Sequence, residues 1–500
     1  MPRRLLLLAA VCALALSLAA RAAKAADDVA RLPLAQADIP AAAVRWYGLY
    51  LDGAKCGYVR EENGIFGTGD AAVHFQSQDS RFKIIAMGKK ITFEESERFE
   101  FDPTPPYAFR RARLVEAEDG KEEIVDVTRT ATGFSARVTS GGEVRTIALP
   151  AIDLTLADAT ASERWLKGRP EVGAVLRARS FATKQMKLDV DTFTVESRTR
   201  TPSASGPSET SVVRHVSTLQ PDVTIAKYDA NGIALSLTMG GVYEARLEPE
   251  EEAKKIRFAR DVFDLGTVKV DRPLGEATGL RRLVLEVEGE GAKAIVAGRR
   301  QTVTHDGTKV VLALGPLAAS RQPAPTQAEI DDALAETVDY PTKLPVVVAL
   351  ARSAVGDAAT PRAKVERLVA FVSRYLADAI VPESVPVPEI IRSKKGDCSE
   401  HARLFTALAR AVGVPTREVS GLMYMGDDLK AFGGHAWAEV ALDGEWIAVD
   451  PTWAQMELDA SHVTLERVGE SSAMATLGRI AFRLREVEPA PKAGAPPPPR

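Results

Sequence analysis

The sequence predicts a multidomain protein with a mainly antiparallel β region at its N-terminal end, a small β unit and a C-terminal α+β domain. Three observations support this prediction. The chain has 500 residues, which is too long for one ordinary domain. Apolar residues alternate with polar ones over much of the first half, a period typical of half-buried strands. After Thr326 the apolar residues recur at the helical period of about 3.6 residues.

Residues 1–25 have the pattern of a secretory signal peptide. Two arginines precede an apolar run at residues 5–20, and Ala23-Lys24-Ala25 fits a cleavage site with small residues. The run is slightly short for a bilayer span of about 20 residues, which favours cleavage over an uncleaved N-terminal anchor. We therefore expect a periplasmic or secreted protein whose mature chain has no stable transmembrane segment.

The charge balance of the chain disfavours nucleic acid as a partner. Removal of residues 1–25 would change the formal net charge from −4 to about −8, because that segment carries four Lys or Arg residues and no acid. No run rich in Lys and Arg follows. An acidic surface repels nucleic acid and anionic lipid, so neither is an expected partner.

Residues 26–260 are predicted to form the β-rich N-terminal domain. The Asn231-Gly232 pair and the stretch "VTSGGEVRTIAL" are both typical of hairpins. A short helix is expected near residues 162–167, and the charged stretch "EPEEEAKKIRFARD" is interpreted as a solvated helical connector.

Residues 265–320 are predicted to form the small β domain, with "RRLVLEVEGE" and "TKVVLALG" as strands. The stretch "ASRQPAPTQ" that follows is typical of a linker. The C-terminal domain is predicted over residues 326–487, and a disordered Pro-rich tail over 488–500.

The C-terminal domain is expected to contain several helices. "LPVVVALARSAV" is apolar and helical, and "VPEIIRSKKG" is expected to form a short helix. Between them, Thr360 and Pro361 have the residue types favoured at the N-cap and the first position of a helix. An apolar stripe follows at Val365, Leu368, Val369 and Val372.

Cys398 is predicted at the first turn of the next helix. Asp397 and Glu400 form a capping-box pattern, and Gly413 is expected to cap the C-terminal end after Val412. Backbone N–H groups at a helix start favour a thiolate. The local pattern leaves a reactive and an inert buried cysteine equally open, while a disulfide with the distant Cys56 is disfavoured.

A hairpin is predicted in "GHAWAEVALDGEWIAVDPTW". If Asp443-Gly444 forms a two-residue turn, Trp437 lies opposite Asp450 and His435 lies diagonal to Asp450. An imidazole and a carboxylate would then be within hydrogen-bond reach. Each has an alternative reading, His435 as a structural histidine and Asp450 as a residue that stabilises the turn after the strand.

Cys398, His435 and Asp450 together make the set that thiol chemistry requires. A thiolate attacks a carbonyl, a histidine takes and returns the proton, and a carboxylate orients the imidazole and stabilises its charged form. The combination favours a nucleophilic cysteine over an inert one.

The stretches "KKGDCSEHARLFTALARAVGVPTREVSGLMY" and "GGHAWAEVALDGEWIAVDPTW" resemble the transglutaminase-like superfamily, a papain-like thiol fold, in its bacterial exported type. The resemblance covers roughly residues 340–465. It implies Cys398 as the nucleophile, His435 as the base and Asp450 as the orienting group. The stretch "LDASHVTL" also resembles a segment that follows the core in exported members.

Other residues near this set are weaker candidates. His401, Trp437 and Tyr424 are suggested to lie at the substrate cleft; His401 could compete as a base, and Trp437 could equally pack in the core. We predict no metal and no cofactor, because the sequence contains no CxxC or HExxH motif. The pair Asp427-Asp428 could form a loose cation site, but a solvated loop is the preferred interpretation.

The leading functional hypothesis is an exported thiol enzyme that attacks an amide in a protein or peptide, with a cell-envelope component as one candidate. The acyl group would pass to water, as in a protease or amidase, or to an amine, as in cross-linking. The alternative is a non-catalytic cell-envelope binding or assembly module. Acetyl transfer from a CoA thioester shares the same chemistry, but export argues against this intracellular cofactor.

Overall fold

The computed structural model describes residues 29, 31–86, 88–201, 208–219, 223–257, 261, 266–276, 278–289, 292, 295, 297–298, 300–306, 309–315, 323–379, 385–465 and 479–489. The predicted signal peptide at 1–25 and residues 490–500 of the predicted tail lie outside these ranges, as do residues 319–322 of the predicted linker. Within the described ranges, no helix is long and apolar enough to cross a membrane.

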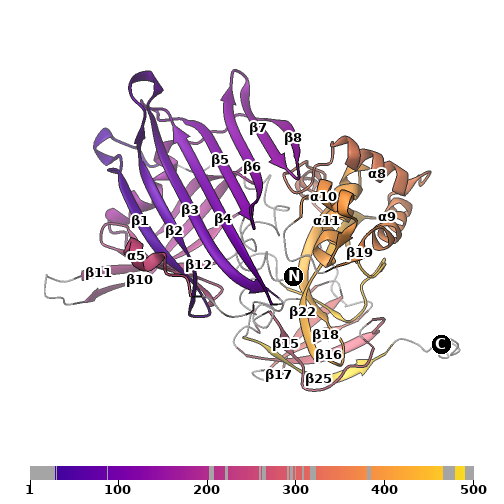
Figure 1. Cartoon of the computed structure of the whole chain (residues 1–500). Coiled ribbons are helices and arrows are strands. Elements are labelled where there is room, and N and C mark those ends of the chain that lie inside the picture. The colour runs from indigo at the N-terminus through magenta and orange to yellow at the C-terminus, as the bar shows by residue number, and fades with distance from the viewer. Residues whose placement is uncertain are drawn as a thin grey trace, which may run out of the picture.

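Fourteen strands form one antiparallel sheet in the order β8-β7-β6-β5-β4-β3-β2-β1-β14-β13-β12-β11-β10-β9. This large sheet confirms the predicted antiparallel β region (Figure 1). The strands are β1 (Ala43–Leu51), β2 (Ala54–Phe66), β3 (Val73–Ala86), β4 (Lys89–Phe101), β5 (Phe109–Glu118), β6 (Lys121–Thr130), β7 (Gly133–Ser140), β8 (Glu143–Leu149), β9 (Val175–Ala182), β10 (Lys187–Thr201), β11 (Ser208–Ser217), β12 (Thr224–Asp229), β13 (Ala234–Met239) and β14 (Tyr243–Glu248).

Tight turns join most neighbouring strands of the large sheet. The predicted hairpin of "VTSGGEVRTIAL" is β7–β8, where Gly141 and Gly142 adopt positive φ angles of 59° and 82°. Such angles suit glycine because it has no Cβ. The Asn231-Gly232 turn likewise joins β12 to β13. The local turn chemistry therefore sets the meander order of the strands.

The large sheet curves, so that strands distant in the order pack against each other. Phe109 of β5 contacts Phe181 of β9, with ring centroids 5.6 Å apart. In Figure 1, β10 and β12 pass behind the front strands. Two short helices, α3 (Leu156–Ala159) and α4 (Ala161–Lys167), precede β9, and α4 confirms the helix predicted near residues 162–167.

Within its described residues, 248–257 and 261, the connector after the large sheet is helical in α5 (Glu250–Ala253). Two 3-10 turns, η1 (Gln36–Asp38) and η2 (Gly69–Ala71), complete the described elements of this region.

A four-stranded sheet contains the two strands predicted in the small β unit. Its order is β17 (Gln301–Asp306), β18 (Lys309–Leu314), β16 (Arg282–Glu288) and β25 (Ala481–Glu488). Strand β25 comes from the far end of the range assigned to the C-terminal domain, and it pairs antiparallel with β16. The small β unit, which precedes that domain in the sequence, and the C-terminal end of the domain therefore meet in one sheet.

The C-terminal domain combines helices with a five-stranded sheet. The helices are α7 (Gln327–Asp332), α8 (Pro345–Val355), α9 (Pro361–Tyr375), α10 (Val387–Ser393) and α11 (Cys398–Ala411). The sheet contains β15 (Val268–Lys269), β22 (Ala431–Leu442), β21 (Thr416–Tyr424) and β24 (His462–Thr464), with β23 (Glu445–Val449) on β22. Two short strands, β19 (Ala377–Asp378) and β20 (Lys395–Gly396), form a separate parallel pair.

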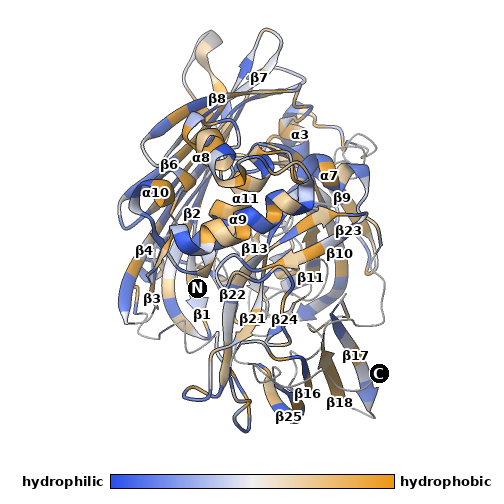
Figure 2. Ribbon diagram, turned by 90° about the vertical axis from the view of Figure 1, so that its right-hand side faces the viewer, coloured by the Kyte–Doolittle hydropathy of each residue, from blue (hydrophilic) through white to orange (hydrophobic). Residues whose placement is uncertain are grey.

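Helix α11 lies at the centre of this domain. Its Leu404, Phe405 and Leu408 are fully buried with the predicted apolar stripe of α9 and with residues of β22 and β23. Hydrophobic and hydrophilic residues are both displayed along α9, which lies in front of α11 in Figure 2. The packing fixes the start of α11 against β22, and this junction carries the candidate site.

Candidate active site

The start of α11 is built by the predicted capping box. Asp397 Oδ1 accepts a hydrogen bond from the Ser399 N–H at 2.9 Å, and Glu400 Oε2 accepts one from the Asp397 N–H at 2.9 Å. The preceding residue must be small, because a Cβ on Gly396 would lie 2.3 Å from the Cβ of Glu400. These contacts hold Cys398 at the first position of the helix.

Cys398 is a free cysteine with 2% exposure, packed with Ala402 and Ala436. Burial raises the pKa of its thiol well above the usual value, and the Asp397 carboxylate adds to this effect. A hydrogen bond from the Ala436 backbone acts in the opposite direction. The expectation that the helix start would favour the thiolate is therefore wrong for this conformation, because desolvation and a neighbouring acid outweigh the N–H groups.

The predicted hairpin register is confirmed. Leu442 pairs with Glu445 and Ala438 with Val449, while the turn residues Asp443 and Gly444 have φ angles of 55° and 79°. This register brings His435 Nε2 to 2.8 Å from Asp450 Oδ2. Because Asp450 engages Nε2, Nδ1 is the ring nitrogen that remains for another partner.

Asp450 is a fully buried carboxylate with four hydrogen-bond donors. Its Oδ2 interacts with His435 and, at 3.1 Å, with Nε2 of His462. Its Oδ1 accepts the backbone N–H groups of Thr452 at 2.7 Å and Trp453 at 3.3 Å. Burial alone would raise the pKa of Asp450, but the two imidazoles outweigh it and hold the pKa below its usual range.

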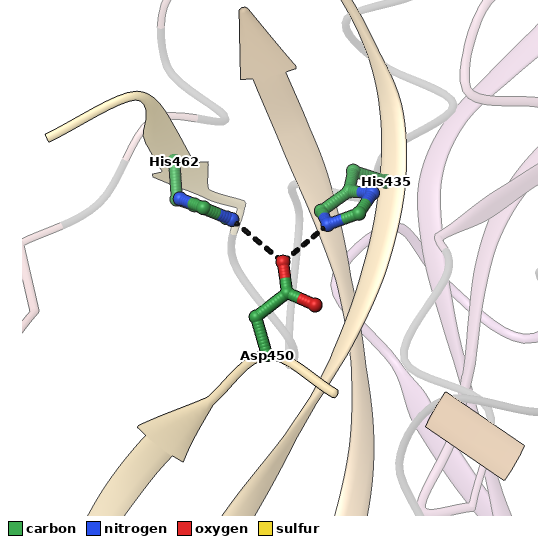
Figure 3. A group of neighbouring side chains, drawn as sticks. All are labelled: His435, Asp450 and His462. Atoms are coloured by element: carbon green, nitrogen blue, oxygen red, sulfur yellow. Dashed lines mark hydrogen bonds and ion pairs between the residues drawn. The ribbon is translucent and has the colours of Figure 1, made fainter. Parts of the chain in front are cut away.

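His462 is a site residue that the sequence reasoning missed. Figure 3 shows its ring and that of His435 converging on one oxygen of Asp450 from two sides. Its Nδ1 lies 3.1 Å from Asp459 Oδ1, so the ring connects two carboxylates. Burial would lower the pKa of His462, but the contacts with Asp450 and Asp459 raise it. The available signal was the Asp459-x-x-His462 spacing within "LDASHVTL".

The cluster of His435, Asp450 and His462 could in principle hold a metal ion, since it offers ligand atoms within 4.8 Å of one another. The separations of 2.8 Å and 3.1 Å are those of hydrogen bonds, however, and a metal would have to displace the shared protons.

A comparison with family models matches residues 348–451 to the transglutaminase-like superfamily. This domain is transglutaminase-like. The match takes in Cys398, His435 and Asp450 but ends before Asp459 and His462. A search of curated proteins found no match.

Three solved structures are similar to the chain at low levels. A beta-barrel-like protein of unknown function from Brucella abortus is 16% identical, covering 42% of this chain and 96% of its own, with a TM-score of 0.30. A protein from Cytophaga hutchinsonii, provisionally described as a cysteine protease, is 15% identical, covering 44% and 86%, with a TM-score of 0.27. A protein from Parabacteroides distasonis, provisionally described as a protease, is 11% identical, covering 77% and 70%, with a TM-score of 0.20. These scores are too low to support an argument.

Three residues suggested for the substrate cleft lie in the core of the transglutaminase-like domain. His401 is fully buried, and its Nδ1 lies 2.7 Å from the Asp397 carbonyl oxygen. Trp437 is also fully buried and packs so closely over Gly421 that a Cβ there would lie 2.3 Å from the indole ring. Tyr424 is 1% exposed and donates to Asp427 Oδ1 at 2.6 Å. Their exposure gives no support to a role as cleft walls.

The loop before β22 uses Asp427 as a structural acceptor. Besides the Tyr424 hydroxyl, Asp427 Oδ1 accepts the N–H groups of Leu274 at 2.9 Å and Gly275 at 3.1 Å. Backbone donors surround this oxygen, which argues against the loose cation site considered for Asp427-Asp428.

Proposed function

We propose that Cys398, His435 and Asp450 act as a catalytic triad that transfers an acyl group from an amide. The single observation that carries this proposal is the hydrogen bond between His435 and Asp450 on the strand against which Cys398 packs. The cysteine thus lies beside the residue that follows His435, and the imidazole is oriented by a buried carboxylate. This arrangement supports an imidazole whose Nδ1 serves the thiol.

The reaction would proceed in two balanced steps. In the first step, His435 takes the thiol proton while the sulfur of Cys398 bonds to the amide carbon. The C–N bond then breaks, and His435 returns the proton to the leaving amine, which yields a thioester. In the second step, water or another amine attacks the thioester carbon, and the thiol is restored with the attacking group's proton.

Water is the preferred acceptor in this proposal, because it is abundant unless a closed cleft excludes it. The substrate would be a protein or peptide, with cell-envelope components as candidates, since the pattern of residues 1–25 supports export. N-terminal sequencing of the chain from a periplasmic fraction tests export: a start at or near residue 26 supports it, and Met1 on a cytoplasmic chain contradicts it.

The test of the triad is the intact mass of the protein after exposure to iodoacetamide, an amide-like alkylator, at neutral pH. Cys56 is the matched control, because it is also free and buried but its thiol donates a hydrogen bond to the Leu49 carbonyl oxygen at 3.5 Å, far from His435 in the sequence. Burial raises the pKa of Cys56 to about 12. We expect one adduct, which remains in Cys56→Ala, disappears in Cys398→Ala and forms more slowly in His435→Ala. Equal labelling of both cysteines, or an unchanged rate in His435→Ala, would contradict the triad.

The burial of Cys398 favours a second candidate, in which the chain is a non-catalytic binding or assembly module of the cell envelope. The large sheet would then carry the function. A complementation experiment separates the two: if Cys398→Ala preserves the phenotype while deletion of residues 44–250 abolishes it, binding is the function.

A further inference from the structure

His462 lies outside the segment that matches the superfamily, yet it contacts the same carboxylate oxygen as His435. The match ends at residue 451, whereas His462 begins β24 and pairs with Met423 of β21. Its Nε2 lies 3.1 Å from Asp450 Oδ2, and its ring centroid lies 5.4 Å from that of His435. Figure 3 shows the carboxylate held between the two rings.

Asp459 holds His462 in this position. One oxygen of Asp459 accepts the Ser461 N–H at 2.9 Å and lies 3.1 Å from His462 Nδ1. The other accepts the Gly279 N–H at 2.6 Å and the Gln455 side-chain amide at 2.8 Å. Asp459 is therefore fixed by its own loop and by the segment that leads into the small sheet.

The surroundings leave His462 little freedom. The side chain is 1% exposed, and its ring meets Trp437 edge-on at 5.6 Å with an interplanar angle of 87°. The Ser461 hydroxyl is a further neighbour of Nδ1, at 3.2 Å. The enclosed ring therefore keeps Nε2 directed at Asp450 while Nδ1 faces Asp459.

The contact between His462 and Asp450 matters because the two backbone N–H donors bind only one oxygen of the carboxylate, Oδ1. Oδ1 is tied to the chain at Thr452 and Trp453, while Oδ2 faces the imidazoles. A second donor on Oδ2 defines the plane of the carboxylate, and that plane sets the direction in which His435 points. A displacement of about 1 Å in a catalytic group can cost about 100-fold in rate.

We propose that His462 is a positioning residue that fixes the carboxylate of Asp450 for His435, and that Asp459 holds His462 in place. This inference rests on the proposed function. The site would then extend beyond residues 348–451, which match the superfamily, to Asp459 and, through its hydrogen bond, to Gly279. Gly279 lies just before β16, so the chain that leads into the four-stranded sheet would help to hold the site.

The test compares His462→Ala with His462→Gln in the full chain, with a p-nitrophenyl ester as a model acyl donor. Glutamine can place an amide nitrogen where Nε2 lies, and so keep the bond to Asp450. We expect His462→Ala to lower kcat about 10- to 100-fold with little change in KM, and His462→Gln to recover most of the loss. His215→Ala is the matched control, because it removes a histidine–aspartate contact of 2.7 Å in the large sheet.

A second measurement does not depend on turnover. The ring nitrogen NMR signals of His435, in protein labelled at histidine, should shift in His462→Ala and stay unchanged in His215→Ala. If the wild type turns over and neither kcat nor these signals change in His462→Ala, the positioning role is wrong. If the signals shift but the wild type has no Cys398-dependent activity, the positioning role stands and the proposed function fails.

Discussion

Two buried carboxylates, one in each half of the molecule, show how the type of donor decides the charge of an acid. Asp189, in the large sheet, is 4% exposed and accepts hydrogen bonds from Val190 N–H at 2.7 Å, Thr218 N–H at 3.0 Å, Leu219 N–H at 3.1 Å and the hydroxyls of Ser217 and Thr218. Asp450, in the transglutaminase-like domain, is also buried and has four donors, of which two are imidazoles.

The pKa values of the two acids shift in opposite directions. Burial and the neighbouring Asp191 raise the pKa of Asp189 despite its neutral donors. Burial would do the same to Asp450, but the hydrogen bonds and charges of His435 and His462 lower its pKa. In this molecule the backbone and hydroxyl donors of Asp189 do not offset its burial, whereas the two imidazoles beside Asp450 do. A buried acid is therefore a candidate for catalysis when its partners are titratable, and a structural element when they are not.

The largest expected effect is on acyl transfer. Asp450→Asn should lower the initial rate with a p-nitrophenyl ester by about 100- to 10,000-fold, because the amide cannot stabilise a charged imidazole. Asp189→Asn should leave the rate within about twofold of the wild type, because the observed donors to Asp189 are backbone N–H groups and hydroxyls. If Asp450→Asn and Asp189→Asn lower the initial rate by comparable factors, the lower rate reflects a damaged fold and not the loss of a catalytic group.

The next effect is on the pH dependence of stability. Asp450 has a lowered pKa, so its contribution is present above the usual value near 3.8 and is lost as the pH falls towards the folded value. Asp189 has a raised pKa, so ionising it costs stability as the pH rises above the same usual value. Denaturant unfolding measures the free energy of unfolding of each variant relative to the wild type from pH 3 to pH 6. The deficit of Asp450→Asn should grow as the pH rises, and the deficit of Asp189→Asn should shrink.

The expected size at the upper end of this range is about 3–5 kcal/mol for Asp450→Asn, since the substitution leaves buried imidazoles without their anion. The same sign of pH dependence in both variants would contradict the assignment of opposite pKa shifts.

The smallest effect concerns one neutral donor of Asp189. Thr218→Val removes the hydroxyl that lies 2.5 Å from Asp189 Oδ1 while the backbone donors remain. We expect a loss of about 1–3 kcal/mol in the free energy of unfolding and no change in acyl transfer. Thermal and denaturant unfolding measure the first quantity, and a fall in the ester rate would show that the two regions are coupled.

The parts of the site that sequence predicts well are the local ones. The capping box at Asp397 and the Asp443-Gly444 turn each act within a few residues, so the start of α11 and the register of His435 and Asp450 follow from short stretches. The predicted strand-rich first half follows in the same way, from turn residues and a period of two.

Long-range contacts could not be predicted from those stretches. His462 reaches Asp450 because β24 pairs with β21, and no local pattern specifies that neighbour. The local pattern left a reactive and an inert Cys398 equally open, because the desolvation that raises the pKa of its thiol depends on Ala436 and the surrounding core, which only the assembled domain defines. Burial and partners from other elements decide whether a given residue is exposed, and sequence spacing says little about either.

The pairing of β25 with β16 constrains the order in which the parts of the chain can fold during synthesis. Strand β16 is synthesised before the transglutaminase-like domain, while β25 is synthesised after it. Until the last strand emerges, β16 exposes an edge that can pair with another chain. The small sheet can therefore close only after the transglutaminase-like domain has been made, and a chain that ends before residue 481 would leave the edge of β16 open to pairing with other chains.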